Sequence, residues 1–253
     1  MSNMGFLQGA YAIWYRELLV FFREKERVIS AIVTPLLWIV AFGGGLGASI
    51  SIEGMSYQQY IFPGIISMSV LFGSIFFGLY VIWDRKLDFL KEVLVAPVPR
   101  SAVFLGKMLG GMSDVFVQIC ALLAIGAALG FVTSLTGALL ALFTAVVMSM
   151  CMVSLGLIIG SKMTSPEGFN LVMSFVMWPM FLTSGALFPI ENLPSYLEIV
   201  VKINPMTYGV DLMRLALLGI TNFGAATDLT ILLVASAAFM FLGSKGFEQM
   251  QLS

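Results

Sequence analysis

The sequence contains no histidine and carries little charge. Its 253 residues include 14 acidic and 13 basic side chains, so 11% are charged, against about 25% in an average soluble domain. The absence of histidine removes the commonest general base and metal ligand. So little charge excludes a soluble enzyme of this size, a disordered chain and a nucleic-acid-binding protein, because each needs far more polar or basic surface.

Cysteine is also scarce, and motifs for catalysis are missing. Cys120 and Cys151 both lie in apolar runs, so no disulfide framework is expected. Without histidine there is no Ser-His-Asp arrangement, and no cluster has the spacing of metal ligands. The only Gly-Lys pair, Gly106-Lys107, is followed by Met108, so the chain has no P-loop for ATP. We predict no enzyme activity, no metal site and no cofactor in this chain.

Hydrophobic residues make up 59% of the chain and are gathered in long runs. A helix needs about 20 consecutive apolar residues to cross a bilayer. Six runs approach or exceed that length, and they predict an all-α integral membrane protein with one transmembrane domain over residues 1–253. The runs cover residues 28–48, 61–83, 102–131, 135–161, 168–188 and 229–245.

The positions of lysine and arginine predict the orientation of these six helices. With both termini on one side, eleven of the 13 basic residues fall on that side, and only Lys202 and Arg214 fall on the other. Cytoplasmic loops carry the excess of basic residues. We therefore predict a multi-pass protein of the plasma (inner) membrane with both termini in the cytoplasm.

Capping residues predict where three of the helices begin. Ser101 follows Pro97 and Pro99 and is expected to cap the third run. The sequence Ser165-Pro166-Glu167 offers a cap, a proline at the first helical position and an acid in the first turn. Asp228 is expected to cap the sixth run.

The segment before the first run predicts an amphipathic helix over residues 5–27 in the cytoplasmic interface. Arg16, Arg23 and Arg27 fall on the face opposite its apolar stripe. The helix is either a simple membrane anchor or a lever or docking element, with Trp14, Arg16 and Arg23 as its candidate residues. The apolar stripe consists of Leu7, Tyr11, Trp14, Leu18, Phe21 and Phe22.

The loop between the second and third runs is longer than a plain connector requires. Leu87, Leu90 and Leu94 have helical spacing, which predicts a short amphipathic helix over residues 85–95 that ends before paired prolines. Asp88 and Glu92 project from its other faces with Lys91. A surface with both charge signs is suited to meet another cytoplasmic protein.

The stretch of residues 189–227 lies outside the membrane between the last two runs. Asn204-Pro205 and Gly219 predict a helix over residues 205–218, and a second short helix is expected over residues 190–202. Asp211 and Arg214 are spaced for a local ion pair. Both helices are apolar enough to dip into the outer leaflet or to pack on the bundle.

One acidic residue lies within an apolar run. Asp114 has Lys107 two turns before it and Gln118 one turn after it. Ionisable groups in a membrane are costly and often functional. These three residues form either a structural polar network or a group with a transport or coupling role.

Aromatic residues recur at helical spacing on two of the runs. Phe72, Phe76 and Tyr80 lie on the second run, and Phe175, Trp178 and Phe181 lie on the fifth, where Pro179 should kink the helix. These rows either pack in the core and face lipid, or line a path for an amphiphilic substrate. Asn170 and Ser174 would add polar groups to such a path.

Two motifs resemble those of a known family. The first is Leu87-Asp-Phe-Leu-Lys-Glu-Val-Leu-Val-Ala-Pro-Val-Pro-Arg100, continuing to Leu105-Gly-Lys107. The second is Ser184-Gly-Ala-Leu-Phe-Pro-Ile-Glu-Asn-Leu-Pro194, leading to Asn204-Pro-Met-Thr-Tyr-Gly-Val-Asp-Leu-Met-Arg214. Together they resemble the ABC-2 type permeases, in particular those of the daunorubicin-resistance and nodulation-factor exporters, over nearly the whole chain.

The resemblance implies a half-transporter without an ATPase of its own. Two permease copies, expected as a homodimer, would pair with two separate ATP-binding subunits, which bind ATP and Mg. The N-terminal helix would be the connecting helix, spans two and five would line a central substrate path along the dimer axis, and the external helices would cap it as a gate. The coupling helix would use Arg85, Leu87, Asp88, Phe89, Leu90, Lys91 and Glu92, and the gate Pro189, Asn204, Pro205, Tyr208, Asp211 and Arg214.

The substrate class is inferred from the few charges and many aromatics of the spans. An apolar aromatic path favours export of an amphiphile, such as a drug, a lipid or a lipo-oligosaccharide, over an ion. Aromatic rings also stack on sugars, so polysaccharide or glycolipid export is the alternative within the class. An ion-coupled secondary transporter that depends on Asp114, and a membrane assembly factor without transport activity, are alternatives outside it.

Overall fold

The computed structural model describes residues 3–46, 51–52, 55–87, 98–190 and 194–249. Apart from one short hairpin, the regular structure in these ranges is helical, which confirms the all-α class. The hairpin pairs β1 (Ser51–Ile52) with β2 (Met55–Ser56) in antiparallel register. The helices are α1 (Asn3–Arg23), α2 (Lys25–Leu46), α3 (Tyr57–Phe76), α4 (Gly78–Lys86), α6 (Arg100–Ala128), α7 (Leu135–Lys162), α8 (Pro166–Leu182), α9 (Ser195–Ile203), α10 (Pro205–Leu218) and α11 (Ala225–Glu248).

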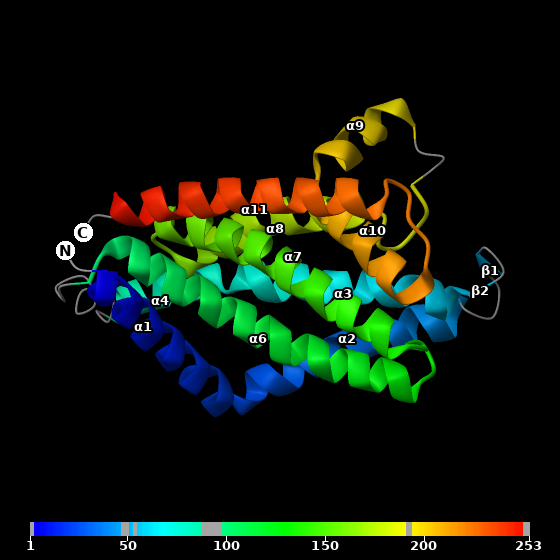
Figure 1. Cartoon of the computed structure of the whole chain (residues 1–253), viewed down its shortest axis with the longest axis horizontal. Helices are drawn as coiled ribbons and strands as arrows, with labels where there is room; N and C mark the ends of the chain where they lie inside the picture. The colour runs from blue at the N-terminus through cyan, green and yellow to red at the C-terminus, as the bar shows by residue number, and fades with distance from the viewer. Residues whose placement is uncertain (1–2, 47–50, 53–54, 88–97, 191–193, 250–253) are drawn as a thin grey trace.

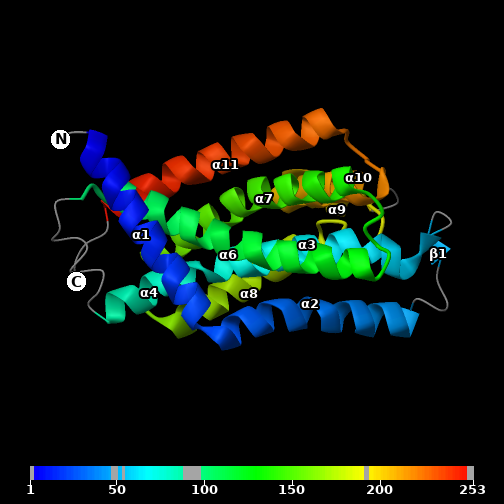
Figure 2. The ribbon, with the colours of Figure 1, turned by 60° about the horizontal axis from the view of Figure 1, so that its bottom comes forward.

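The long helices run side by side and give the molecule two distinct ends (Figure 1). At the first, which we call the terminal end, α1 begins, α4 ends and α11 ends. At the second, the hairpin end, lie β1, β2, α9 and the turn between α6 and α7. Figure 2 shows α1 crossing obliquely over α6, with α2 continuing along one side of the bundle and α11 along the other.

Four helical segments in the described ranges are long and apolar enough to cross a membrane. They are Tyr57–Lys86, which joins α3 and α4, and Arg100–Ala128, Leu135–Lys162 and Ala225–Glu248. The other two predicted spans correspond to α2 and α8, which are not among these four. The α8 helix ends at Leu182 after 17 residues, short of the expected position 188, and Gly185 follows with a left-handed φ of 77°. The count of six spans therefore stays a prediction.

The structure confirms one of the three predicted N-caps and contradicts the other two. Ser165 does cap α8, since its Oγ accepts a hydrogen bond from the Gly168 amide at 3.0 Å. However, α6 begins at Arg100, so Ser101 lies inside its first turn. Asp228 also lies inside α11, whose N-cap is Gly224 with a φ of 91°. Both expectations were wrong by a few residues: the N-caps are Pro99 and Gly224, and neither makes a side-chain capping hydrogen bond.

The predicted helix over residues 5–27 is two helices. The α1 helix ends at Arg23 and α2 begins at Lys25, with Glu24 between them. Figure 2 shows that the two helices continue in different directions. The face of α1 that packs on α6 carries Ala10, Ile13 and Phe21, whereas Leu7 and Tyr11 of the expected stripe are exposed.

Candidate functional site

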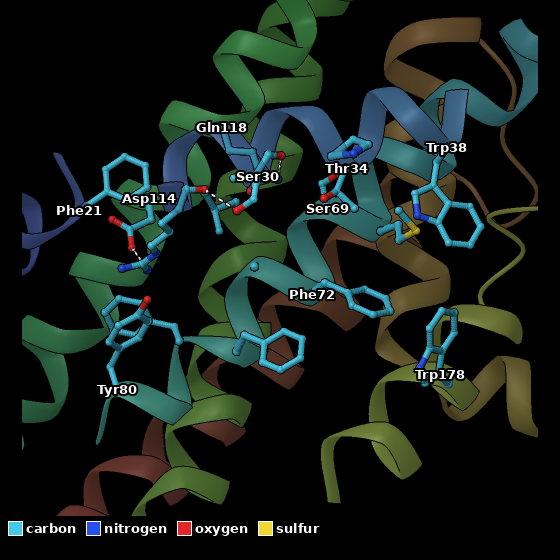
Figure 3. Close-up of a pocket in the computed structure, with 18 residues that line it drawn as sticks. Phe21, Ser30, Thr34, Trp38, Ser69, Phe72, Tyr80, Asp114, Gln118 and Trp178 are labelled. Atoms are coloured by element: carbon cyan, nitrogen blue, oxygen red, sulfur yellow. Dashed lines mark hydrogen bonds and ion pairs between the residues drawn. The ribbon is translucent and has the colours of Figure 1, made fainter. Parts of the chain in front are cut away.

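A cavity of about 540 Å³ opens between α2, α3, α4, α6 and α8. Its volume is within the range of about 300–1,000 Å³ that is usual for small-molecule sites. Figure 3 shows its lining: Asp114 and Tyr80 lie toward one side, Trp38 and Trp178 toward the other, and Phe72 between them. The cavity thus has a charged side and an aromatic side.

The aromatic side is built by rings from three helices. Phe72 of α3 meets Trp178 of α8 edge to face, with ring centroids 5.3 Å apart at 76°. Phe181 lies behind them, 6.1 Å from Phe72 and 6.4 Å from Trp38 of α2. Edge-to-face ring pairs contribute stabilisation beyond that of their buried area, so these contacts hold the rings of the wall in place. Trp178 is nevertheless 40% exposed.

The charged side is centred on Arg27, near the start of α2. Its guanidinium group forms an ion pair with Asp114 of α6 and lies 4.3 Å from the ring centroid of Tyr80. A second carboxylate, that of Glu24, lies 3.5 Å from Arg27 and accepts a hydrogen bond from the Tyr80 hydroxyl at 3.3 Å. The Oδ1 atom of Asp114 is buried and has no hydrogen-bond partner among the described residues.

A second charged cluster lies deeper toward the terminal end and joins α1, α4 and α6. Lys107, which is 1% exposed, donates to Glu17 at 3.0 Å and also to Asp84. Arg16 contacts the same two carboxylates at 2.8 and 3.1 Å. Two bases therefore neutralise two acids inside the protein. We call Arg16, Glu17, Asp84 and Lys107 the buried ion cluster.

The predicted polar set of Lys107, Asp114 and Gln118 is divided among different partners. Lys107 belongs to the buried ion cluster, Asp114 pairs with Arg27, and the Gln118 amide donates to the Ala31 carbonyl at 2.7 Å. Lys107 thus fastens α6 to α1 and α4, whereas Asp114 and Gln118 both fasten it to α2.

The sequence analysis predicted none of these charged partners. Arg16 and Arg27 were expected on a solvated face, and this was wrong because both point inward to buried acids. Glu17 was also missed, although it lies one turn from Ile13 and from Phe21 on the buried face of α1. The signal that could have revealed Glu17 is that it stands as a single acidic residue on the apolar, buried face of α1. Arg23 is exposed, and Trp14 donates from Nε1 to Ser113 Oγ at 2.9 Å.

Four of the seven predicted path residues line the cavity, namely Phe72, Phe76, Tyr80 and Trp178. Phe181 is 1% exposed and supports the wall from behind. Asn170 and Ser174 lie on the exposed face of α8 outside the cavity lining, and the Ser174 hydroxyl bonds to the Asn170 carbonyl. The cavity lies within one copy of the chain and also uses α2 and α6, which the sequence reasoning had not included.

The predicted coupling segment is described only at its start. Arg85 donates to the carbonyl oxygens of Ser161 and Met163 at 2.9 and 3.1 Å, so it closes the end of α7. Leu87 is 72% exposed at the end of α4. The remaining coupling residues, Asp88, Phe89, Leu90, Lys91 and Glu92, lie outside the described residues.

The predicted gate residues form a connected structure at the hairpin end. Asn204 caps α10 by accepting from the Met206 amide at 3.0 Å, and it donates to the Met180 carbonyl of α8 at 2.6 Å. The Tyr208 hydroxyl donates to the Lys202 carbonyl at 2.7 Å. Pro205 begins α10, which ends at Leu218 before Gly219 as predicted, and Pro189 lies in the connection after α8.

The local pair expected between Asp211 and Arg214 is not formed. Arg214 donates to the Gly185 carbonyl at 2.8 Å, and its guanidinium lies 4.4 Å from the ring centroid of Tyr60. Asp211 instead accepts hydrogen bonds from the turn before α11. Both side chains therefore bond to segments outside α10 rather than to each other.

Comparison with known proteins identifies the family. The model of the ABC-2 type transporter family matches residues 8–218, so the chain belongs to this family. It is 30% identical over 245 residues to the inner membrane transport permease YadH of Escherichia coli, covering 91% of both chains. It is 25% identical over 212 residues to nodulation protein J of Rhizobium meliloti, covering 82% of this chain and 80% of that protein.

The family fixes the broad role of the chain. It is a multi-pass membrane permease of an ABC transporter, as the apolar helices and the inner membrane relatives indicate together. Permeases of this family are not themselves ATPases, and membership of the family implies an ABC ATP-binding subunit as a partner.

Proposed function

We propose that this chain is the permease of an ATP-driven exporter that moves an amphiphilic molecule outward through the cavity between α2, α3, α4, α6 and α8. Two copies would act with two ATP-binding subunits, and both termini would face the cytoplasm. The observation that carries the proposal is the cavity itself, which joins an aromatic wall to an ion-paired polar side. An amphiphile needs both kinds of surface.

The α4 helix supplies a physical connection between the cavity and the partner ATPase. Tyr80 lines the cavity, and Asp84, one turn further along, belongs to the buried ion cluster. The chain then leaves α4 at Leu87 and enters the segment proposed as the coupling helix. Because α4 has only nine residues, we expect a displacement of its C-terminal end to move Tyr80 by a similar distance.

The coupling assignment is tested by reversing two charges in the segment that follows α4. The double substitution D88K/E92K should reduce recovery of the ATP-binding subunit with the tagged permease at least about tenfold, because charge reversal at a docking surface opposes association. Pull-down and quantitative mass spectrometry measure this. The swap E198K/K202E, which keeps a surface pair on α9, is the matched control. Undiminished recovery with D88K/E92K would contradict the assignment.

The cavity is tested with two aromatic substitutions on α3 and α8. F76A and W178A should each weaken amphiphile transport about tenfold, since loss of an aromatic contact costs of the order of 1.4 kcal/mol. Transport into inverted vesicles measures this with a panel of an aromatic cation, a phospholipid and an oligosaccharide. F175A is the matched control, because Phe175 is 75% exposed on α8 and does not line the cavity. Equal transport by all three variants would show that the cavity is not the path.

The same panel separates the alternatives. Preferential transport of the oligosaccharide would favour polysaccharide or glycolipid export. An ion-coupled secondary transporter would work without ATP and would lose activity in D114N. That alternative is less well supported, because Arg27 occupies one oxygen of the Asp114 carboxylate.

A further inference from the structure

The guanidinium group of Arg27 lies among three aromatic rings at the charged side of the cavity. Its Cζ atom is 4.3 Å from the ring centroid of Tyr80, 5.4 Å from that of Phe21 and 5.8 Å from that of Phe77. A cation within about 6 Å of a ring centroid is attracted by the negative face of the ring. Figure 3 shows the rings of Phe21 and Tyr80 on either side of the ion pair that Asp114 forms. We call this arrangement of rings and ion pair the cation cage.

Two carboxylates complete the cation cage. Asp114 pairs with Arg27 from α6, and its side chain is only 9% exposed. Glu24 pairs with Arg27 from the connection between α1 and α2, and its side chain is 42% exposed. Among the described residues that line the cavity, Arg27 is the only base. The cage therefore presents three ring faces and two carboxylates to a positive charge.

The balance of charges in the cation cage differs from that in the buried ion cluster. In the buried ion cluster, two bases neutralise two acids. The cage holds one base, Arg27, for the two acids Glu24 and Asp114, and the buried Oδ1 atom of Asp114 has no hydrogen-bond partner among the described residues. A buried charge is costly unless it is paired. An anionic head group would add to the excess of negative charge, whereas a cationic head group would remove it.

Arg27 can move away from Asp114 without losing every partner, because Glu24 offers it a second carboxylate. Glu24 and Arg27 are three residues apart, and their pair lies nearer to solvent than Asp114 does. The long arginine stem allows its charged head to reach toward water. With a second cation on Asp114 and Arg27 on Glu24, two positive charges would face two carboxylates, as in the buried ion cluster.

We propose that the cation cage binds the positively charged head group of the transported amphiphile, and that Arg27 is an internal cation that this head group displaces toward Glu24. The apolar part of the same molecule packs on Phe72 and Trp178 at the aromatic side of the cavity. The inference rests on the proposed export function and narrows its substrate class to cationic amphiphiles, which carry an ammonium or guanidinium group. Anionic lipids and acidic saccharides are poor substrates for such a site.

The charge of the site is tested with three probes that differ only in their head groups. All share a phenylbutyl tail, and they carry a trimethylammonium group, the neutral tert-butyl group of the same shape, or a carboxylate. Binding is measured by isothermal titration calorimetry of the full chain in phosphatidylcholine nanodiscs, with empty nanodiscs subtracted. The ammonium probe should bind at least about tenfold more tightly than either of the others, because it alone gains the rings and the carboxylate.

Substitutions of Arg27 and Asp114 should change this preference in opposite directions. R27Q removes the competing internal cation and should strengthen binding of the ammonium probe about tenfold. D114N removes the carboxylate and should make the ammonium and neutral probes bind alike, which keeps the test decisive if R27Q folds poorly. R23Q is the matched control, because Arg23 is exposed at the end of α1, and it should bind all three probes as the wild type does.

The outcomes distinguish failure of this site from failure of the proposed function. Equal binding of the three probes that W178A still weakens would overturn the cation site but leave the cavity as the path. Tighter binding of the carboxylate probe, or weaker binding of the ammonium probe to R27Q, would also overturn it, because Arg27 would then bind the head group itself. If none of the probes binds, both the cation site and the proposed path are contradicted.

Discussion

Replacement of Lys107 with methionine should destabilise the chain by about 3–5 kcal/mol, as expected when one partner of a buried ion pair is removed. Lys107 is the ammonium group between Glu17 and Asp84, which are 4% and 6% exposed. Without it, Arg16 alone would face two buried carboxylates. Thermal unfolding in detergent, together with the yield of monodisperse protein, measures the loss.

Two variants show whether the loss has this cause. K202M breaks the exposed Lys202–Glu198 pair on α9 and should change the melting temperature little, because surface pairs contribute little. The triple variant E17Q/D84N/K107M should recover much of the stability, since it removes the three buried charges together and leaves only Arg16, whose side chain is 33% exposed. If K107M melts at the wild-type temperature, the cluster is not buried in the folded protein.

A methyl group at Gly156 should also be strongly destabilising, by about 3 kcal/mol, because α7 packs against α3 and α4 with backbones in contact. A Cβ at Gly156 would lie 2.5 Å from the carbonyl oxygen of Ile75, and one at Gly78 would lie 2.0 Å from that of Gly156. Overpacking against rigid backbone typically costs 1–3 kcal/mol or more. The expected result for G156A is a lower melting temperature and a poor yield of folded protein.

The matched control is G45A on α2, where a Cβ would have no atom within 4 Å. This substitution should be neutral or slightly stabilising, because alanine is a better helix former than glycine by about 1 kcal/mol. Equal melting temperatures for G156A and G45A would mean that α7 does not approach α3 and α4 this closely.

The buried ion cluster has a consequence for transport as well as for stability. It fastens α1 to α6 and to the end of α4, and α4 also carries Tyr80 at the charged side of the cavity. Under the proposed function, the cluster is the joint through which movement of the coupling segment reaches the cavity. A variant such as E17Q/D84N/K107M that folds but no longer couples ATP hydrolysis to transport would support this role.

Local features of the sequence determined much of the architecture. The apolar runs predicted the all-α membrane class, and Asn204-Pro205 with Gly219 predicted both ends of α10. These signals are local: helix length, a capping side chain and a left-handed glycine act within a few residues. The aromatic rows on the second and fifth runs likewise placed Phe72, Phe76, Tyr80 and Trp178, which line the cavity.

Only the tertiary structure decided which charged groups meet. Lys107 contacts Glu17 across 90 residues of sequence, and Arg27 contacts Asp114 across 87, whereas Asp211 and Arg214 are neighbours on one helix and do not pair. The amphipathic pattern assigned Arg16 and Arg27 to water, yet both are held by buried acids on α4 and α6. The physical reason is that burial makes an unpaired charge far more costly than a local pair is favourable, so the packing of distant helices determined the partners.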